Sequence, residues 1–143
     1  MKKVELHTDG SALGNPGRGG WGFIIKFGVH EKEDSGSVKH ATNNQMELMA
    51  VIKGLEAIKE PCDIQLFSDS KYVLDGLEKW IHNWKAKGWK TAARKDVANK
   101  EMWIELDKLR NKHKIQFNWV KGHNGDPLNE RVDKLANSAA QKA

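Results

Sequence analysis

The sequence predicts an α/β fold, in which helices cover both faces of a mixed five-stranded sheet. Three observations predict it. β-Forming segments dominate the first part of the chain, and the short connections between them are typical of an antiparallel meander. Two later segments, 63–67 and 114–120, are each reached through helical segments, and such crossovers join parallel strands. Three antiparallel strands followed by parallel strands therefore make up the sheet.

The N-terminal elements follow from simple patterns. Apolar and polar residues alternate over 4–8, which predicts a half-buried strand, and the glycine-rich run after it is compatible with a hairpin loop. β-Forming residues over 20–28 predict a second strand, and 32–41 predict a third, antiparallel one because the intervening loop is short. Apolar residues recur at helical spacing over 43–59, where Pro61 stops the helix.

Strands and helices alternate in the next part of the chain. Residues 63–67 predict a fourth strand. The pattern over 70–84 predicts a helix that breaks near 81–83. A further helix over 99–112 turns its apolar residues, Trp103 among them, toward the core.

Two further elements complete the chain. Residues 114–120 alternate as a fifth strand, and a last helix begins where Asp126 serves as the N-cap and Pro127 takes the first helical position. No linker, repeat or low-complexity tract interrupts the sequence. We therefore expect residues 1–143 to form a single domain.

The composition is that of an ordinary globular protein. The chain has 143 residues, 38% apolar and 30% charged, which is enough for one core. No run approaches the roughly 18 apolar residues of a membrane span, and the N-terminus has no signal-peptide pattern. The single cysteine, Cys62, is expected to be buried, as suits a reducing compartment. These features together predict a cytoplasmic location. We expect a monomer, because no exposed apolar stripe stands out.

A basic segment, residues 79–100, carries much of the positive charge. The whole chain has 24 Lys and Arg against 19 Asp and Glu, a net charge of +5. In the basic segment, lysines alternate with Trp80, Trp84 and Trp89, and such a pattern suits phosphates and sugars or bases. The alternative is a solvated helix whose tryptophans face the core. We expect Trp80 in the core and Trp89 at the surface.

Acidic residues fall where an open α/β sheet binds its ligands, beyond the carboxyl ends of parallel strands. Asp9 is expected to end the first strand, Asp69 follows the fourth, and His123 lies in the loop after the fifth. Glu47 is in the first turn of its helix, and Asp133 is in the second turn of the last helix. Two carboxylates and an imidazole therefore arise at one sheet edge, and two further acids can join them.

Each acid also has a purely structural explanation. Glu47 fits a capping box, Asp69 fits an N-cap, and Asp133 can pair with the neighbouring Arg131 or Lys134. Together the four acids would repel one another unless protonated or bridged by cations. Ligands that are all oxygen suit Mg²⁺ or Mn²⁺, and two such ions about 4 Å apart assist phosphodiester cleavage.

Four sequence blocks carry a family resemblance: TDGSALGNPGRGGWG, TNNQMELMA, SDSKYV and WVKGHNGDPLNERVDKLA. In their order and spacing they resemble type 1 ribonuclease H, and bacterial ribonuclease HI most of all, over essentially the whole chain. The resemblance implies a ribonuclease H-like fold and an endonuclease that hydrolyses the RNA strand of RNA/DNA hybrids. It also implies two Mg²⁺ ions per site, with Mn²⁺ as an alternative, and products with 5′-phosphate and 3′-hydroxyl ends.

The same resemblance assigns roles to the acids. Asp9 and Asp69 would share both ions. Glu47 would hold one ion and accept a hydrogen bond from a ribose 2′-hydroxyl, and Asp133 would hold the other ion. His123, in a glycine-flanked loop, is similar to the family histidine that assists proton transfer or product release; the alternative is a solvated loop histidine.

Substrate contacts implied by the resemblance form three groups. The wide minor groove exposes the 2′-hydroxyl that distinguishes RNA from DNA, and the residues similar to its readers are Gly10, Ser11, Asn15, Asn43 and Asn44. The residues similar to those that hold the DNA strand are Thr42, Trp80, Asn83 and Trp84. The part of the basic segment similar to the family's basic protrusion is 85–95, with Lys85, Lys87, Trp89 and Lys90. Asn43 and Asn44 have helix capping as their alternative.

A few positions depart from the commonest bacterial pattern, namely Ala12, Arg18, Ser68 and Lys71. Only Lys71 affects recognition, because it stands where a glutamine usually touches the minor groove. There it can exchange a base or sugar contact for a phosphate contact.

Two other functions are compatible with parts of the sequence. A DNA-cleaving nuclease of the same broad fold would have no use for the TNN block, which reads 2′-hydroxyls, and a non-catalytic binding module would not need all four acids. The resemblance favours the hybrid-specific enzyme, with RNA primer removal and R-loop clearance as its cellular roles.

Overall fold

The sheet has five strands in the order β3-β2-β1-β4-β5 within residues 1–122 and 126–143, the part of the chain that the computed structural model describes. The strands are β1 (Lys2–Gly14), β2 (Gly17–Phe27), β3 (His30–Ala41), β4 (Cys62–Ser68) and β5 (Lys114–Trp119). β1, β2 and β3 pair antiparallel, whereas β4 pairs parallel with both β1 and β5. The predicted mixed sheet is confirmed.

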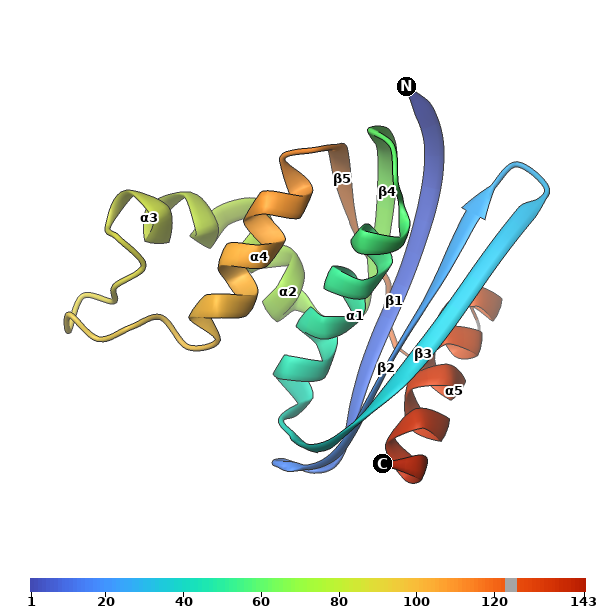
Figure 1. Ribbon diagram of the computed structural model, residues 1–143, viewed down its shortest axis with the longest axis horizontal. Coiled ribbons are helices and arrows are strands. Elements are labelled where there is room, and N and C mark those ends of the chain that lie inside the picture. The colour runs from blue at the N-terminus through green and yellow to red at the C-terminus, as the bar shows by residue number, and fades with distance from the viewer. Residues whose placement is uncertain (123–125) are drawn as a thin grey trace.

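Helices cover both faces of the sheet, as predicted (Figure 1). They are α1 (Asn43–Ala57), α2 (Lys71–Asp75), a π-helix η1 (Gly76–Trp80), α3 (Ile81–Ala86), α4 (Lys100–Arg110) and α5 (Pro127–Lys142). α5 packs on one face, against β1, β2 and β3, and α1 packs on the other. α5 lies very close to β2, because a Cβ atom at Gly20 would overlap the main chain of α5 at Ala136.

The main core lies between the sheet and the layer of α1 and α4. Leu6 of β1, Leu66 of β4, Leu48 of α1 and Trp103 of α4 are all completely buried there. Cys62 is also buried, as predicted. Burial of large apolar side chains is the main free-energy source for such a core, and it fixes α1 and β4 against β1.

The first strand is longer than predicted, and the interpretation of its glycine run as a loop is wrong. β1 does not end at Asp9 but continues through Gly14, paired with β2 as far as Gly14 opposite Gly17. The parallel pairing with β4 stops earlier, at His7 opposite Phe67. Antiparallel pairing therefore overrides the local preference of glycines for turns, and Asp9 still lies just beyond the end of the parallel ladder.

The helical segment after β4 breaks earlier than predicted. The irregularity is the π-helix at Gly76–Trp80, not residues 81–83. Gly76 packs directly against the indole of Trp103, since a Cβ atom there would overlap the ring. The π-helix therefore begins at the residue that packs against α4.

Two tryptophan predictions are also wrong. Trp80, expected in the core, is 38% exposed. Trp89, expected at the surface, is half-buried and packs against the core. The π-helix turns Trp80 outward, while a positive φ of 64° at Trp89 folds the loop after α3 back onto the protein.

Candidate active site

Three carboxylates from three elements meet at the predicted sheet edge. Asp9 lies within β1, Glu47 in α1, and Asp69 directly after β4. One carboxylate oxygen from each lies within 4.8 Å of the others. Asp9 and Glu47 are buried, with exposed fractions of 3% and 4%. We call these three residues the carboxylate cluster.

The absence of a side chain at Gly10 lets α1 approach β1 closely enough to form the cluster. A Cβ atom on Gly10 would overlap the main chain of α1 at Met46 and Glu47. The Gly10 N–H donates to Glu47 Oε1 at 2.7 Å and to Asp9 Oδ1 at 3.0 Å. One backbone donor therefore orients two of the three acids.

Burial and mutual repulsion disfavour full ionisation of the cluster. Burial raises the pKa of Asp9, and the nearby charges of Glu47 and Asp69 raise it further. Burial also raises the pKa of Glu47, although hydrogen bonds from Asp9 and the Gly10 N–H oppose this shift. Such a site favours protons or cations, either of which relieves the repulsion.

Asp133 reaches the cluster from α5. The carboxyl group of Asp133 also raises the pKa of Asp9, through a side-chain hydrogen bond. Asp133 does not pair with Arg131 on a solvated face, because Arg131 binds Glu31 and Glu33 at 2.9 and 2.6 Å. Asp133 therefore lies near Asp9 and Glu47, outside the group of three whose oxygens lie within 4.8 Å of one another.

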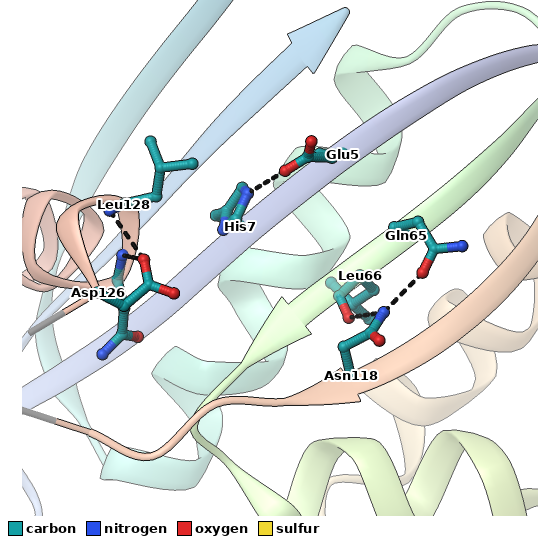
Figure 2. Close-up of polar contacts among 8 residues, drawn as sticks. Glu5, His7, Gln65, Leu66, Asn118, Asp126 and Leu128 are labelled. Atoms are coloured by element: carbon teal, nitrogen blue, oxygen red, sulfur yellow. Dashed lines mark hydrogen bonds and ion pairs between the residues drawn. The ribbon is translucent and has the colours of Figure 1, made fainter. Parts of the chain in front are cut away.

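The start of α5 is fixed by the predicted cap. Asp126 Oδ1 accepts from the N–H groups of Leu128 and Asn129 at 3.0 and 3.1 Å, as Figure 2 shows for Leu128. Pro127 takes the first helical position, as predicted. The cap therefore fixes the residue at which α5, the helix that carries Asp133, begins.

The capping alternatives for Glu47 and Asp69 are wrong. The capping box of α1 joins Thr42 and Gln45, and the N-cap of α2 is Ser70. The donor set of the cluster is three carboxylates, and hard cations such as Mg²⁺ and Mn²⁺ prefer oxygen ligands of this kind. The residues present therefore fit a divalent metal site.

Sequence reasoning missed Asn137, which links two predicted site residues. Its Nδ2 donates to Asp133 at 3.2 Å, and its Oδ1 accepts from Ser11 Oγ at 2.6 Å. The signal was present, because residue 137 lies one helical turn after Asp133. Asn137 orients Asp133 and connects it to β1.

The residues predicted to read the minor groove lie at the end of β1 and the start of α1. Asn15 Oδ1 accepts from the Asn43 N–H at 3.1 Å, which joins the β1–β2 turn to α1. Asn43 and Asn44 are exposed, and neither caps the helix, because Thr42 does. The exposed amides are therefore available for a ligand beside Gly10 and Ser11.

α3 and the loop after it, which form most of the basic segment, lie across α4 from the sheet (Figure 1). Trp80, Trp84 and the buried Trp103 form an aromatic series, with ring centroids 5.8 Å apart for the first pair and 5.2 Å apart for the second. Asn83, which precedes Trp84 in the sequence, is exposed. Lys85 Nζ contacts Asp107 Oδ2 of α4 at 2.9 Å, so α3 is anchored by charge as well as by packing.

Lys90, Lys71 and His123 complete the predicted set. Lys90 pairs with Asp96 within the loop after α3. Lys71, the first residue of α2, places Nζ 4.4 Å from the ring centroid of Trp119. His123 lies outside the described residues; Gly122 before it lies next to Asp69, since a Cβ atom there would be 3.1 Å from Asp69 Oδ2.

Comparison with known proteins decides the family. The RNase H family model matches residues 1–141. The chain belongs to the RNase H family. It is 57% identical over 143 residues to ribonuclease H of Novosphingobium aromaticivorans, with all of both chains covered. It is 54% identical over 136 residues to ribonuclease H of Rhizobium meliloti, covering 95% of this chain and 89% of that one.

Solved structures of RNase H proteins share the fold. LC9-RNase H1, described as a type 1 RNase H with the type 2 active-site motif, matches with a TM-score of 0.91 and 30% identity, over 99% of this chain and 74% of that one. LC11-RNase H1 in complex with an RNA/DNA hybrid matches with a TM-score of 0.74 and 23% identity, over 97% of each chain. Membership of the RNase H family makes the chain a nuclease, as the sequence predicted.

Among the described residues, no helix is both long and apolar enough to cross a membrane.

Proposed function

We propose that this RNase H hydrolyses the RNA strand of RNA/DNA hybrids with divalent cations held by its acidic residues. The observation that carries the proposal is the carboxylate cluster, whose oxygens lie within 4.8 Å of one another at the edge of an RNase H fold. The metal is Mg²⁺, with Mn²⁺ as an alternative, and two ions bind per site with substrate present. The products carry 5′-phosphate and 3′-hydroxyl ends.

Each acid has a distinct task in this proposal. Asp9 and Asp69 hold both ions, Glu47 holds one, and Asp133 holds the other. When bound, the ions supply a water activated for attack and stabilise the leaving oxygen. Glu47 also accepts a hydrogen bond from a ribose 2′-hydroxyl, which the Gly10 N–H supports by fixing Oε1. Asn137 keeps Asp133 in place.

Selectivity for RNA rests on the amides beside the cluster. Asn15, Asn43 and Asn44 can donate to and accept from 2′-hydroxyls in a wide minor groove. The hydrogen bond between Asn15 and Asn43 holds two of these residues in one arrangement. The close approach of α1 to Gly10 brings that surface next to the acids.

The DNA strand is held by a second group of residues. Thr42 and Asn83 bind a phosphate, while Trp80 and Trp84 test for flexible deoxyribose. The exposed face of Trp80 supports this role. Lys85, Lys87, Trp89 and Lys90 hold the duplex without regard to sequence.

His123 assists proton transfer or product release from the loop before α5. We further propose that the enzyme acts as a cytoplasmic monomer that removes RNA primers and clears R-loops.

The decisive experiment is cleavage of an end-labelled RNA strand in three contexts: paired to DNA, paired to RNA, and alone. Each substrate is incubated with Mg²⁺, with Mn²⁺ and with EDTA. Metal-dependent cleavage of the hybrid alone is the expected result. Cleavage of a labelled DNA duplex would favour the DNA nuclease, and tight hybrid binding without turnover would favour the binding module.

A single variant tests the metal assignment. Asp69→Asn removes one charge but keeps the size of the side chain. Turnover should be abolished while the circular dichroism spectrum stays that of the parent. Substantial residual turnover would contradict the proposed role of the cluster.

A further inference from the structure

Trp119, the last residue of β5, stands beside the carboxylate cluster. It pairs with Ser68 across the parallel ladder, one position before Asp69. Its indole N–H donates to the main-chain oxygen of Asp69 at 3.1 Å. Trp119 is nevertheless 49% exposed, so part of its indole is accessible to solvent.

The ammonium of Lys71 lies against that ring. Its ammonium lies 4.4 Å from the ring centroid of Trp119, well within the range of a cation–π contact. Lys71 is also exposed, at the start of α2, two residues after Asp69. The indole of Trp119 therefore makes two contacts: its N–H binds the main chain of Asp69, and its ring contacts the Lys71 ammonium.

We propose that Trp119 is a positioning residue, whose ring holds the Lys71 ammonium at the rim of the carboxylate cluster to bind a backbone phosphate of the substrate. This inference rests on the proposed function. A long lysine side chain normally loses much rotamer freedom when it binds a ligand. A ring that already restrains the ammonium reduces this loss, so the cation is ready for the phosphate.

The chemistry at this edge calls for such a cation. Until cations bind, the three carboxylates, which lie within 4.8 Å of one another, repel an approaching phosphodiester backbone. A fixed ammonium beside them offsets that repulsion for a phosphate next to the cleaved one. The indole N–H has a separate task, because it fixes the main chain from which the Asp69 carboxylate extends.

The protein contains a matched control. Lys53 Nζ of α1 lies 5.9 Å from the ring centroid of Trp21, a second lysine–tryptophan pair. It lies on α1 nearly two turns beyond Glu47, and its ammonium also contacts Glu56. Lys53→Gln therefore removes a lysine of the same kind from a place that the proposal does not assign to substrate.

The test combines kinetics with binding. KM and kcat for hybrid cleavage are measured for Lys71→Gln, Lys71→Arg, Trp119→Leu, Trp119→Phe and the double variant Lys71→Gln/Trp119→Leu. Hybrid affinity is measured separately in EDTA by fluorescence anisotropy over a series of salt concentrations. Thermal unfolding of every variant checks that the fold is kept.

Lys71→Gln and Trp119→Leu should each raise KM roughly threefold. Lys71→Gln should also lower the slope of log affinity against log salt by about one. The double variant should have the KM of Lys71→Gln, because both changes remove the same contact. Lys71→Arg and Lys53→Gln should keep the parental KM. Trp119→Phe keeps an aromatic ring but loses the indole N–H, so it should lower kcat more than it raises KM, whereas Trp119→Leu loses both contacts and should change both constants.

Two outcomes would overturn the proposal. One is an unchanged salt slope in Lys71→Gln. The other is a double variant whose fold-increase in KM equals the product of the fold-increases in the two single variants. Failure of the proposed function itself is a separate result, because in that case the parent enzyme would not cleave the hybrid. The salt slopes in EDTA do not depend on turnover and would still test Lys71.

Discussion

At the scale of single residues, Gly10 is important because it has no side chain. A Cβ atom there would overlap the main chain of Met46 and Glu47, so Gly10→Ala must push α1 away from β1. We expect a loss of about 2 to 3 kcal/mol in the free energy of unfolding, as for overpacked cores, together with loss of activity. Urea unfolding and hybrid cleavage measure the two effects.

Gly28 provides the control for Gly10. It has a φ of +59°, but a Cβ atom at this position would have no neighbour within 4 Å. Gly28→Ala should cost only the backbone strain, about 1 kcal/mol, and leave activity intact. Equal losses for the two alanine variants would show that close packing at Gly10 is not the cause.

Asp9 is a residue whose charge destabilises the metal-free fold. Burial and the neighbouring carboxylates raise the pKa of Asp9, so its charge is unfavourable without a cation. Asp9→Asn should therefore stabilise the metal-free protein by about 1 kcal/mol while abolishing turnover. Urea unfolding in EDTA measures the gain.

The exposed Asp34 serves as a control for Asp9, because among the described residues its carboxylate accepts only from the adjacent Ser35 N–H. Asp34→Asn should change stability by less than about 0.5 kcal/mol. An Asp9→Asn variant less stable than its parent in EDTA would mean that the hydrogen bonds of Asp9 outweigh the repulsion.

At the scale of elements, a histidine joins the end of α4 to the start of β4. His113 Nδ1 accepts from the Cys62 N–H at 3.1 Å, which requires a neutral acceptor nitrogen. Burial, and then the charge of Lys112, lower the pKa of His113 from its ordinary value of 6.5. The unfolded chain therefore binds this proton at a higher pH than the folded chain does.

The sign of the pH effect follows from that difference. The contribution of His113 to stability is complete above about pH 6.5 and is lost as pH falls through the folded pKa. His113→Gln keeps an acceptor without a charge, so its unfolding free energy should fall less than that of the parent between about pH 7 and pH 5. The exposed His30→Gln is the control, and identical pH profiles for parent and His113→Gln would refute the assignment.

The order and pairing of elements could be predicted because they follow from periodicity and connection length. Element ends could not, because pairing partners decide them. The glycines of β1 favour turns locally, yet the register with β2 keeps Gly14 in the strand. The π-helix begins at Gly76, which packs against Trp103, a contact between segments that no local pattern contains.

The site was predicted better than the surfaces around it. Asp9, Glu47 and Asp69 could be grouped because strand ends and helix starts place them at one sheet edge. Asn137 was missed, because on a helix a polar residue normally indicates a solvated face. Trp119 was missed for the opposite reason, since an aromatic residue in a strand normally indicates the core.

At the scale of the whole molecule, the carboxylate cluster and the basic segment belong to different parts of the fold. The acids gather at the sheet edge, whereas the basic segment lies beyond α4 (Figure 1). α4 holds the basic segment, because its buried Asp107 binds Lys85 of α3 at 2.9 Å. Arg110 of α4 also donates to the Leu77 carbonyl in the π-helix at 3.0 Å. The basic segment is thus a fixed projection from the core.

This arrangement predicts that the lysines of the basic segment contribute unequally to hybrid binding. Lys85 and Lys90 already pair with Asp107 and Asp96, so a phosphate must compete with a carboxylate for each. Within residues 1–122 and 126–143, no carboxylate forms an ion pair with Lys87, which ends α3 in an exposed position. Lys87→Gln should lower the salt slope of hybrid affinity by about one, and Lys85→Gln and Lys90→Gln by less. Fluorescence anisotropy in EDTA measures all three slopes, and equal decreases would show that the ion pairs open freely when the duplex binds.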